Sequence, residues 1–189
     1  GFDTTGIYYQ NPSMGVRSMR VKTLFIVNKR KFSYSSAYFN TQRQLKTAGS
    51  LLLISNLYDY SFTSDTSLIP PAAREFYGSY GMMNSFRVQG ISIGPGYSFN
   101  LVLFKTLYLN MTLTSGFDFQ HRNIQTYDNS YSSKKWKVGA AGDFRTAIGL
   151  NGKRMFVSLT YRVDYNSYLN TGMRIEPPYH SVDFNFGYR

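Results

Sequence analysis

The chain has 189 residues, and its 21 Lys and Arg against 10 Asp and Glu give a formal net charge of +11. It contains 17 Tyr and 15 Phe but only 16% charged residues, a composition that favours strands and differs from that of an ordinary soluble domain. The lack of Cys excludes a disulfide framework and a thiolate metal site, and the absence of any apolar run near the roughly 20 residues of a membrane helix excludes a helical membrane protein.

The first expected strands have weak patterns. Alternation of apolar and polar residues predicts strands at about 20–28, 31–39 and 45–62. The segment 71–78, PAAREFYG, has room for one helical turn within a long loop. Because helical periodicity recurs nowhere, we expect helices to contribute little to the fold.

The later strands show clear period-2 alternation. They are expected at 91–103, 107–115, 136–150 and 155–165, and the last lies within 179–189. Successive side chains of a strand point to opposite faces, so each of these strands has one apolar or aromatic face and one polar face. The chain therefore contains about eight expected strands.

The connections between these strands alternate in length. Only the connection at 28–31 is short where a long one is expected. Long extracellular loops alternating with short periplasmic turns are typical of an outer-membrane barrel, and an even strand count would place both ends of the chain on the periplasmic side. The long connections are 63–85, 120–134 and 166–179, and the short ones lie near 40–44, at Lys105–Thr106 and at 151–154.

One hairpin allows a prediction of register. Asn151-Gly152 is the dipeptide preferred in a type I′ turn, which would place Leu150 opposite Lys153. The same register places Asp143 opposite Thr160, so the polar faces of the two strands coincide.

The character of the two faces favours a membrane barrel over a soluble sandwich or soluble barrel. The polar faces combine small residues with charges of both signs, as in the crowded interior of a narrow barrel. Aromatic residues such as Tyr58, Phe104, Trp136 and Tyr188 lie near strand ends and are typical of interfacial girdles. We therefore expect an all-β, antiparallel up-and-down transmembrane β-barrel formed by a single domain, 1–189.

Two groups of residues resemble known outer-membrane proteins. The alternation of Val182, Phe184, Phe186 and Tyr188 is similar to the C-terminal assembly signal of bacterial outer-membrane barrels, although this chain ends in Arg189 rather than in an aromatic residue. The sequences NKRKFSYSSAY, QLKTAGSLL and GPGYSFN, within 28–120, resemble a Bacteroidota outer-membrane β-barrel family known only as a domain of unknown function. The resemblance implies a secreted barrel with further strands upstream of Gly1, so that this chain is the C-terminal portion of a larger barrel. It implies no catalytic residues.

Charged residues on the polar faces form the main candidate site. Asp143, Arg145, Arg162, Asp164 and Asp183 fall on one expected inner surface. We interpret them as an ion-pair network that fills the lumen. The alternative is a polar constriction that selects solutes.

Catalytic and cofactor chemistry has little support in the sequence. His121 and His180 are the only imidazoles, so no metal site and no cofactor are expected. His121 beside Asn123 is compatible with a Ser-His-Asn lipase, but these residue types are common in loops and the spacing is not specific.

The basic residues suggest an anionic partner. Lys29, Arg30, Lys31, Lys134 and Lys135 are candidates for contacts with the phosphates of lipopolysaccharide, with a solvated loop as the alternative. No nucleic-acid recognition motif appears, so a nucleic-acid partner is not expected.

These patterns predict a non-enzymatic subunit of the outer membrane of a Gram-negative bacterium. Its expected role is structural or accessory, within a larger complex of outer-membrane chains. A narrow channel or solute-uptake barrel is the first alternative, and an outer-membrane lipid-modifying enzyme is the second.

Overall fold

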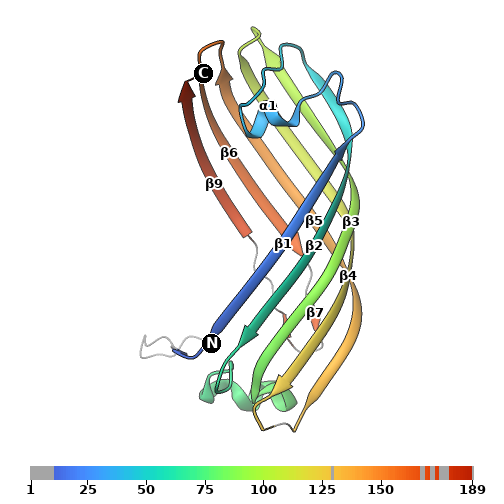
Figure 1. Cartoon of the computed structure of the whole chain (residues 1–189), viewed down its shortest axis with the longest axis vertical. Helices are drawn as coiled ribbons and strands as arrows, with labels where there is room; N and C mark the ends of the chain where they lie inside the picture. The colour runs from blue at the N-terminus through green and yellow to red at the C-terminus, as the bar shows by residue number, and fades with distance from the viewer. Residues whose placement is uncertain (1–10, 129, 167–168, 171–172, 175–178, 189) are drawn as a thin grey trace.

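The chain folds into one long antiparallel sheet that curls into a half-barrel (Figure 1). The computed structural model describes residues 11–128, 130–166, 169–170, 173–174 and 179–188. Seven strands follow one another in the order of the chain, which confirms the all-β, antiparallel, up-and-down architecture. These strands are β1 (Gly15–Ile26), β2 (Ala48–Thr63), β3 (Met83–Leu103), β4 (Leu107–Thr126), β5 (Ser132–Asn151), β6 (Met155–Asn166) and β9 (Tyr179–Tyr188). A separate two-stranded ribbon pairs β7 (Leu169–Asn170) with β8 (Met173–Arg174).

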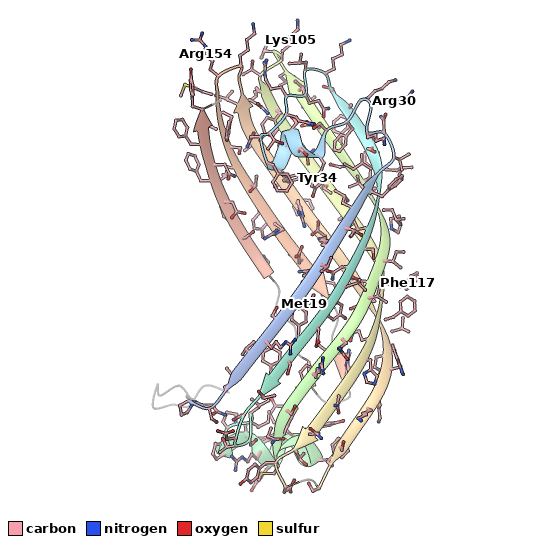
Figure 2. All side chains as sticks on the ribbon, in the orientation of Figure 1. Met19, Arg30, Tyr34, Lys105, Phe117 and Arg154 are labelled. Atoms are coloured by element: carbon pink, nitrogen blue, oxygen red, sulfur yellow. The ribbon has the colours of Figure 1, made fainter. Side chains whose placement is uncertain are left out.

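The alternation in the sequence decides which side chains point into the concave face of the sheet. Along β4, Tyr108, Asn110 and Thr112 are buried, whereas Leu109 and Met111 between them are exposed. Figure 2 shows Met19 of β1 and Phe117 of β4 on the outside of the curled sheet. The apolar faces therefore point outward and the polar faces point inward.

The expected strand at 31–39 is wrong. Residues 27–47 connect β1 to β2, and they contain a short helix, α1 (Tyr34–Tyr38). The Ser33 side chain caps this helix by accepting a hydrogen bond from the Ser36 amide at 3.1 Å. Before it, the amides of Lys31 and Phe32 both donate to the Asn28 carbonyl, which turns the chain out of the extended form. Local hydrogen bonding overrides the alternation there.

The expected long loop at 120–134 is also wrong. β4 continues to Thr126 and β5 begins at Ser132, so the connection is only 127–131. Beyond Phe119 the outward positions of β4 change from apolar to polar, starting with His121 and Asn123. With most positions polar on both faces and Ile124 as the inward exception, the alternation that marks a strand fades from the sequence although the strand continues.

The hairpin between β5 and β6 has a different register from the predicted one. Leu150 lies opposite Val157, and Asp143 lies opposite Asp164. Asn151 remains in the sheet because its amide donates to the Thr106 carbonyl. The turn closes instead through a hydrogen bond from the Gly152 amide to the Met155 carbonyl. The shift is an even number of residues, so each side chain keeps the face that the alternation assigned to it.

The two ends of the half-barrel are covered differently. Residues 27–47, here called the plug segment, lie across the end that also holds the turns at 104–106 and 152–154 (Figure 1). The opposite end carries residues 64–82 with the 3₁₀ helix η1 (Pro71–Tyr80), near the start of β1. Among the described residues, no helix is long and apolar enough to cross a membrane.

Candidate functional site

Polar side chains fill the concave interior of the sheet. The alternation brings them inward from every strand, and many of them hydrogen-bond to one another, as Asn40 does to Ser158 and Gln120 to Asp118. The largest side chains that are fully buried are all polar: Gln120, Asn40, Asn100, Asn110, Thr112, Thr126, Asp118, Ser98 and Ser158.

An ion cluster occupies the middle of this interior. Arg145 of β5 donates from Nε to Oδ1 of Asp143 at 2.8 Å and from Nη2 to Oδ2 at 2.9 Å. Lys22 of β1 lies 2.7 Å from Asp143 and 3.8 Å from Asp164 of β6. Arg20 of β1 donates to Asp164 at 3.0 Å and to Asn56 at 2.9 Å. We call these five charged residues the interior ion cluster.

Three strands must meet for this cluster to form. Asp143 and Asp164 are directly opposite on β5 and β6, and like charges in that position destabilise a sheet unless cations lie between them. Two of the three cations, Arg20 and Lys22, come from β1, which is four strands away from β5 in the sheet order. The curl of the sheet brings β1 back across the interior, so the curling of the sheet and the charge compensation occur together.

The structure brings together three of the five predicted network residues, namely Asp143, Arg145 and Asp164. Arg162 lies on the same face, directly opposite Arg145. Asp183 of β9 is displaced from the cluster, with its carboxylate 3.5 Å from the Thr160 hydroxyl and 3.3 Å from that of Ser181.

Arg20 and Lys22 are the members that sequence reasoning missed. Both lie on one face of the expected strand at 20–28, which was a usable signal. What the sequence does not give is the curvature that carries β1 to β5 and β6.

A second buried chain of hydrogen bonds runs toward the η1 end. The Tyr58 hydroxyl donates to the fully buried Asp118 carboxylate at 2.9 Å, and Gln120 Nε2 donates to the same carboxylate at 2.6 Å. Arg122 then donates to Gln120 Oε1. Tyr58 therefore lies inside the barrel, which corrects its expected place in an outer aromatic girdle.

The plug segment is tied to the far wall of the barrel through its aromatic residues. The Tyr38 hydroxyl lies 2.6 Å from Asn110 Oδ1 and 2.8 Å from Thr112 Oγ1, both on β4. Burial raises the pKa of Tyr38 above its usual value, which keeps this hydroxyl protonated as a donor. On the same strand, the Tyr108 hydroxyl donates to the Ala37 carbonyl at 2.9 Å.

Further contacts extend the plug segment to β5 and β6. Asn40 Nδ2 donates to Ser158 Oγ at 2.8 Å, and Asn151 Nδ2 donates to the Gln42 carbonyl at 3.0 Å. Arg43 Nε donates to the Asn151 carbonyl at 3.1 Å. A segment that begins between β1 and β2 thus crosses the interior to the opposite wall.

The η1 end is closed by apolar packing instead. Tyr58, Ile69 and Phe86 belong to a buried cluster at that end, and Tyr77 and Tyr80 of η1 pack against it. The barrel interior is therefore closed at one end by hydrogen bonds and at the other by apolar contacts.

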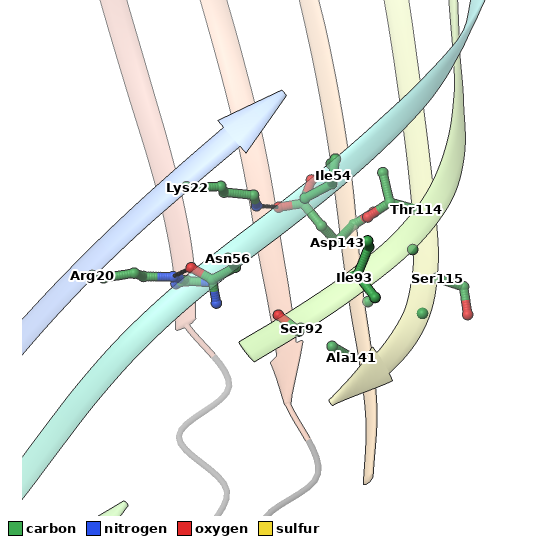
Figure 3. A pocket seen from close by; sticks show the side chains of 13 residues that line it. Arg20, Lys22, Ile54, Asn56, Ser92, Ile93, Thr114, Ser115, Ala141 and Asp143 are labelled. Atoms are coloured by element: carbon green, nitrogen blue, oxygen red, sulfur yellow. Dashed lines mark hydrogen bonds and ion pairs between the residues drawn. The ribbon is translucent and has the colours of Figure 1, made fainter. Parts of the chain in front are cut away.

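A small cavity remains beside the interior ion cluster (Figure 3). Arg20, Lys22 and Asp143 line it, together with small residues such as Gly94 and Gly116. Its volume is about 30 Å³, enough for roughly two water molecules. A Cβ atom on Gly94 would lie 2.5 Å from the Gly116 Cα, so glycine is needed where the two strands approach each other.

The basic residues proposed for lipopolysaccharide contact lie in two separate places. Lys29, Arg30 and Lys31 are exposed on the plug segment. Lys134 and Lys135 are exposed on β5, near its η1 end. The structure does not bring the two groups together.

The predicted assembly signal lies on the outer face of an edge strand. Val182, Phe184, Phe186 and Tyr188 are exposed on β9, which pairs only with β6 among the described strands. Arg189, which follows this pattern, lies outside the described residues.

Nothing in the described geometry assembles a hydrolytic or metal centre. His121 is on the outer face, where its ring centroid lies 5.0 Å from that of Trp136 in a tilted arrangement, and no described Ser hydroxyl lies within hydrogen-bonding distance of it. The described residues hold no cluster of three His, Asp or Glu side chains able to bind a metal.

Comparison with known proteins yields a family match. The model of a family described as "Domain of unknown function (DUF4421)" matches residues 3–189. This match covers nearly the whole chain, more than the 28–120 over which the sequence resemblance was noted. Searches of curated proteins and of solved structures found no match to the chain.

Proposed function

Because the chain belongs to this family, whose description names no function, we propose a function from the geometry of the chain itself. It forms the wall of an integral outer-membrane β-barrel with a filled lumen, in the Bacteroidota, as the sequence resemblance implies. Its role is non-enzymatic and structural or accessory, within a larger outer-membrane complex.

The observation that carries this proposal is the inverted distribution of polarity. The largest fully buried side chains are polar, whereas Leu113, Phe117 and Phe184 are each more than 60% exposed. A monomer in water rarely exposes an apolar patch larger than a few hundred Å², and here the apolar residues follow every strand. In lipid the same arrangement is favourable, because the acyl chains contact the apolar face and the backbone is satisfied within the sheet.

The length of the apolar belt supports the same conclusion. Outward positions are mostly apolar over 91–103 on β3, 107–119 on β4 and 138–150 on β5. Each stretch is roughly 40 Å long at the rise of a β-strand. At the roughly 45° tilt of a membrane strand this spans roughly 30 Å, the thickness of the hydrocarbon core.

A filled lumen supports a structural rather than a transporting role. The plug segment closes one end, the η1 cluster closes the other, and the interior ion cluster lies between them. An exposed aromatic residue on η1, Phe76, offers a contact for another chain at the mouth.

Two measurements on the native protein test the proposal. The chain is expected in the outer-membrane fraction, to be released by detergent and not by high salt or alkaline carbonate. Purification in mild detergent is expected to retain other outer-membrane chains. Release by salt alone would refute the membrane placement, and a chain that purifies alone would refute the accessory role.

A narrow channel is the second candidate, favoured by the charged lining of the small cavity. Replacing residues 29–46 by a short Gly-Ser turn distinguishes the two functions in planar bilayers. If the interior ion cluster and the apolar cluster at the η1 end also block the lumen, this variant conducts no more than the wild-type protein. A channel gated by the plug segment would instead give discrete conductance steps after its removal.

A further inference from the structure

The end of the barrel that carries the plug segment is strongly basic. Three segments form this end, 27–47, 104–106 and 152–154, and none contains Asp or Glu. They hold eight of the 21 Lys and Arg residues of the chain. We call these eight residues the basic rim: Lys29, Arg30, Lys31, Arg43, Lys46, Lys105, Lys153 and Arg154.

The connecting segments at the opposite end have the opposite charge balance. Its connecting segments 64–82 and 127–131 contain Asp65, Glu75 and Asp128 but only one cation, Arg74. The positive charge of the connecting segments is therefore concentrated at one end. Figure 2 shows Arg30, Lys105 and Arg154 together at that end, with their side chains directed away from the sheet.

Little within the chain compensates these cations. None of the eight lies within 4.0 Å of a carboxylate oxygen of the described residues. Arg43 has a structural role, because its guanidinium donates to the carbonyls of Asn151 and Lys105. Self-repulsion among the remaining exposed cations destabilises the fold unless an anionic surface neutralises them.

The rim lies where the apolar belt ends. Lys29 follows Val27, Lys105 follows Leu103, and Lys153 follows Leu150 within a few residues. Phe104, in the turn beside Lys105, is 91% exposed. Aromatic and cationic residues at the margin of an apolar belt match the depth of lipid head groups.

We propose that the basic rim binds the phosphates of anionic phospholipids in the leaflet at the tight-turn end of the barrel. This inference rests on the membrane placement proposed above. Short turns face the periplasm in outer-membrane barrels, so this leaflet is the inner one. Lys29, Arg30 and Lys31 then contact phospholipid, and Lys134, on the outer face at the other end, faces the leaflet that contains lipopolysaccharide.

A fluorescent reporter at the rim tests the proposal. Trp136 is the only Trp, so Trp136→Phe with Phe104→Trp places a single Trp beside Lys105. The protein is folded into phosphatidylcholine vesicles that contain either brominated phosphatidylglycerol or brominated phosphatidylcholine, both of which quench Trp on contact. Preferential quenching by the anionic lipid reports its enrichment at the rim.

The expected preference for phosphatidylglycerol is about fivefold or more, the effect of at least one engaged cation at low salt. About 1 M salt is expected to reduce it toward one, because the screening length is then about 3 Å. Replacing the seven rim residues other than Arg43 by Gln is expected to abolish it, with Arg43 retained for its structural bonds. The matched control, Lys134→Gln with Lys135→Gln, is expected to leave the preference unchanged.

The possible failures are distinguishable. Equal quenching by the two lipids, or a preference that survives in the seven-Gln variant, overturns the lipid assignment and leaves the barrel in the membrane. An acidic protein bound to the rim would also give equal quenching. Quenching by neither lipid overturns the membrane placement and this proposal together.

Discussion

Two Arg–Asp pairs in this chain have similar geometry and different surroundings. Arg145 and Asp143 approach to 2.8 Å with side chains that are 14% and 5% exposed. Arg87 and Asp59 approach to 2.6 Å with side chains that are 46% and 23% exposed. Burial, rather than distance, decides how much removal of one partner costs, because a buried charge left unpaired has no water to solvate it.

We therefore predict that Arg145→Met lowers the free energy of unfolding by about 3 kcal/mol, whereas Arg87→Met changes it little. Asp143 and Asp164 would remain opposite each other with only Lys22 and Arg20 to compensate them. Urea unfolding in lipid vesicles, followed by Trp136 fluorescence, measures both variants. Equal losses in the two variants would contradict the role assigned to burial.

Tyr34 of the plug segment provides a test through pH. Burial raises the pKa of its hydroxyl to about 12, compared with about 10 in an unfolded chain. Between these values the unfolded state loses the proton and the folded state keeps it, so stability is present below about pH 10 and falls as the pH rises toward 12.

Between pH 10 and 12, the free energy of unfolding of the variant Tyr34→Phe is accordingly expected to fall by about 2 kcal/mol less than that of the wild-type protein. Unfolding curves of the two proteins at each pH give the difference, in which the titration of lysines common to both cancels. Parallel pH profiles for the two proteins would show that Tyr34 is solvated.

At the scale of elements, the turn between β3 and β4 is strained. Phe104 and Lys105 both have positive φ, at 52° and 59°, and the Thr106 amide donates to the Leu103 carbonyl across the turn. This is the geometry in which Asn-Gly is preferred, because other residues place their Cβ too close to the backbone.

Replacing Phe104-Lys105 by Asn-Gly is expected to raise the free energy of unfolding by about 1–2 kcal/mol. Lys105→Ala separates the effect of charge, because it removes the cation and keeps the strained backbone. If the alanine variant gained as much stability as Asn-Gly, relief of charge repulsion rather than of strain would be the cause.

The sequence predicts elements where one face is apolar and the other is polar, and it fails where this contrast ends. Alternation located β5 and β6 and their inward Asp143, Arg145 and Asp164, and the even error in register did not disturb the faces. It lost the ends of β4 and β5, where both faces are polar.

Tertiary contacts explain the remaining differences. Asn151 does not form the expected turn because its amide bonds to Thr106 and its side chain bonds to the plug segment. Residues 31–39 of the plug segment were expected to form a strand, since nothing local reveals that Tyr38 and Asn40 reach β4 and β6. The ion cluster was incomplete in the prediction for the same reason, because Arg20 reaches Asp164 only through the curvature of the sheet.

For the whole molecule, the direction of the two edge strands constrains how the barrel closes. Seven antiparallel strands in chain order make β1 and β9 run in the same direction. Direct pairing of these edges would be parallel, unlike every other pair in the sheet. A second copy related by an axis along the membrane normal would likewise pair β1 with a parallel β9. Antiparallel closure requires an odd number of further alternating strands between β9 and β1, of which the first and the last run opposite to these two edges. The total number of strands is then even.

Cysteine pairs can test this closure because the chain contains no Cys. Two residues form a disulfide only when their Cα atoms lie within about 7 Å, and one intervening strand separates β1 from β9 by roughly 10 Å. Pairs that combine Met19, Val21 or Phe25 with Val182, Phe184 or Phe186 are therefore expected to remain reduced in lipid under mild oxidation. The neighbouring pair Leu159 and Phe184, directly opposite on β6 and β9, is expected to cross-link under the same conditions and serves as the positive control. A disulfide between β1 and β9 at any of these positions would mean that the edges meet directly and that the barrel closes through a parallel pair.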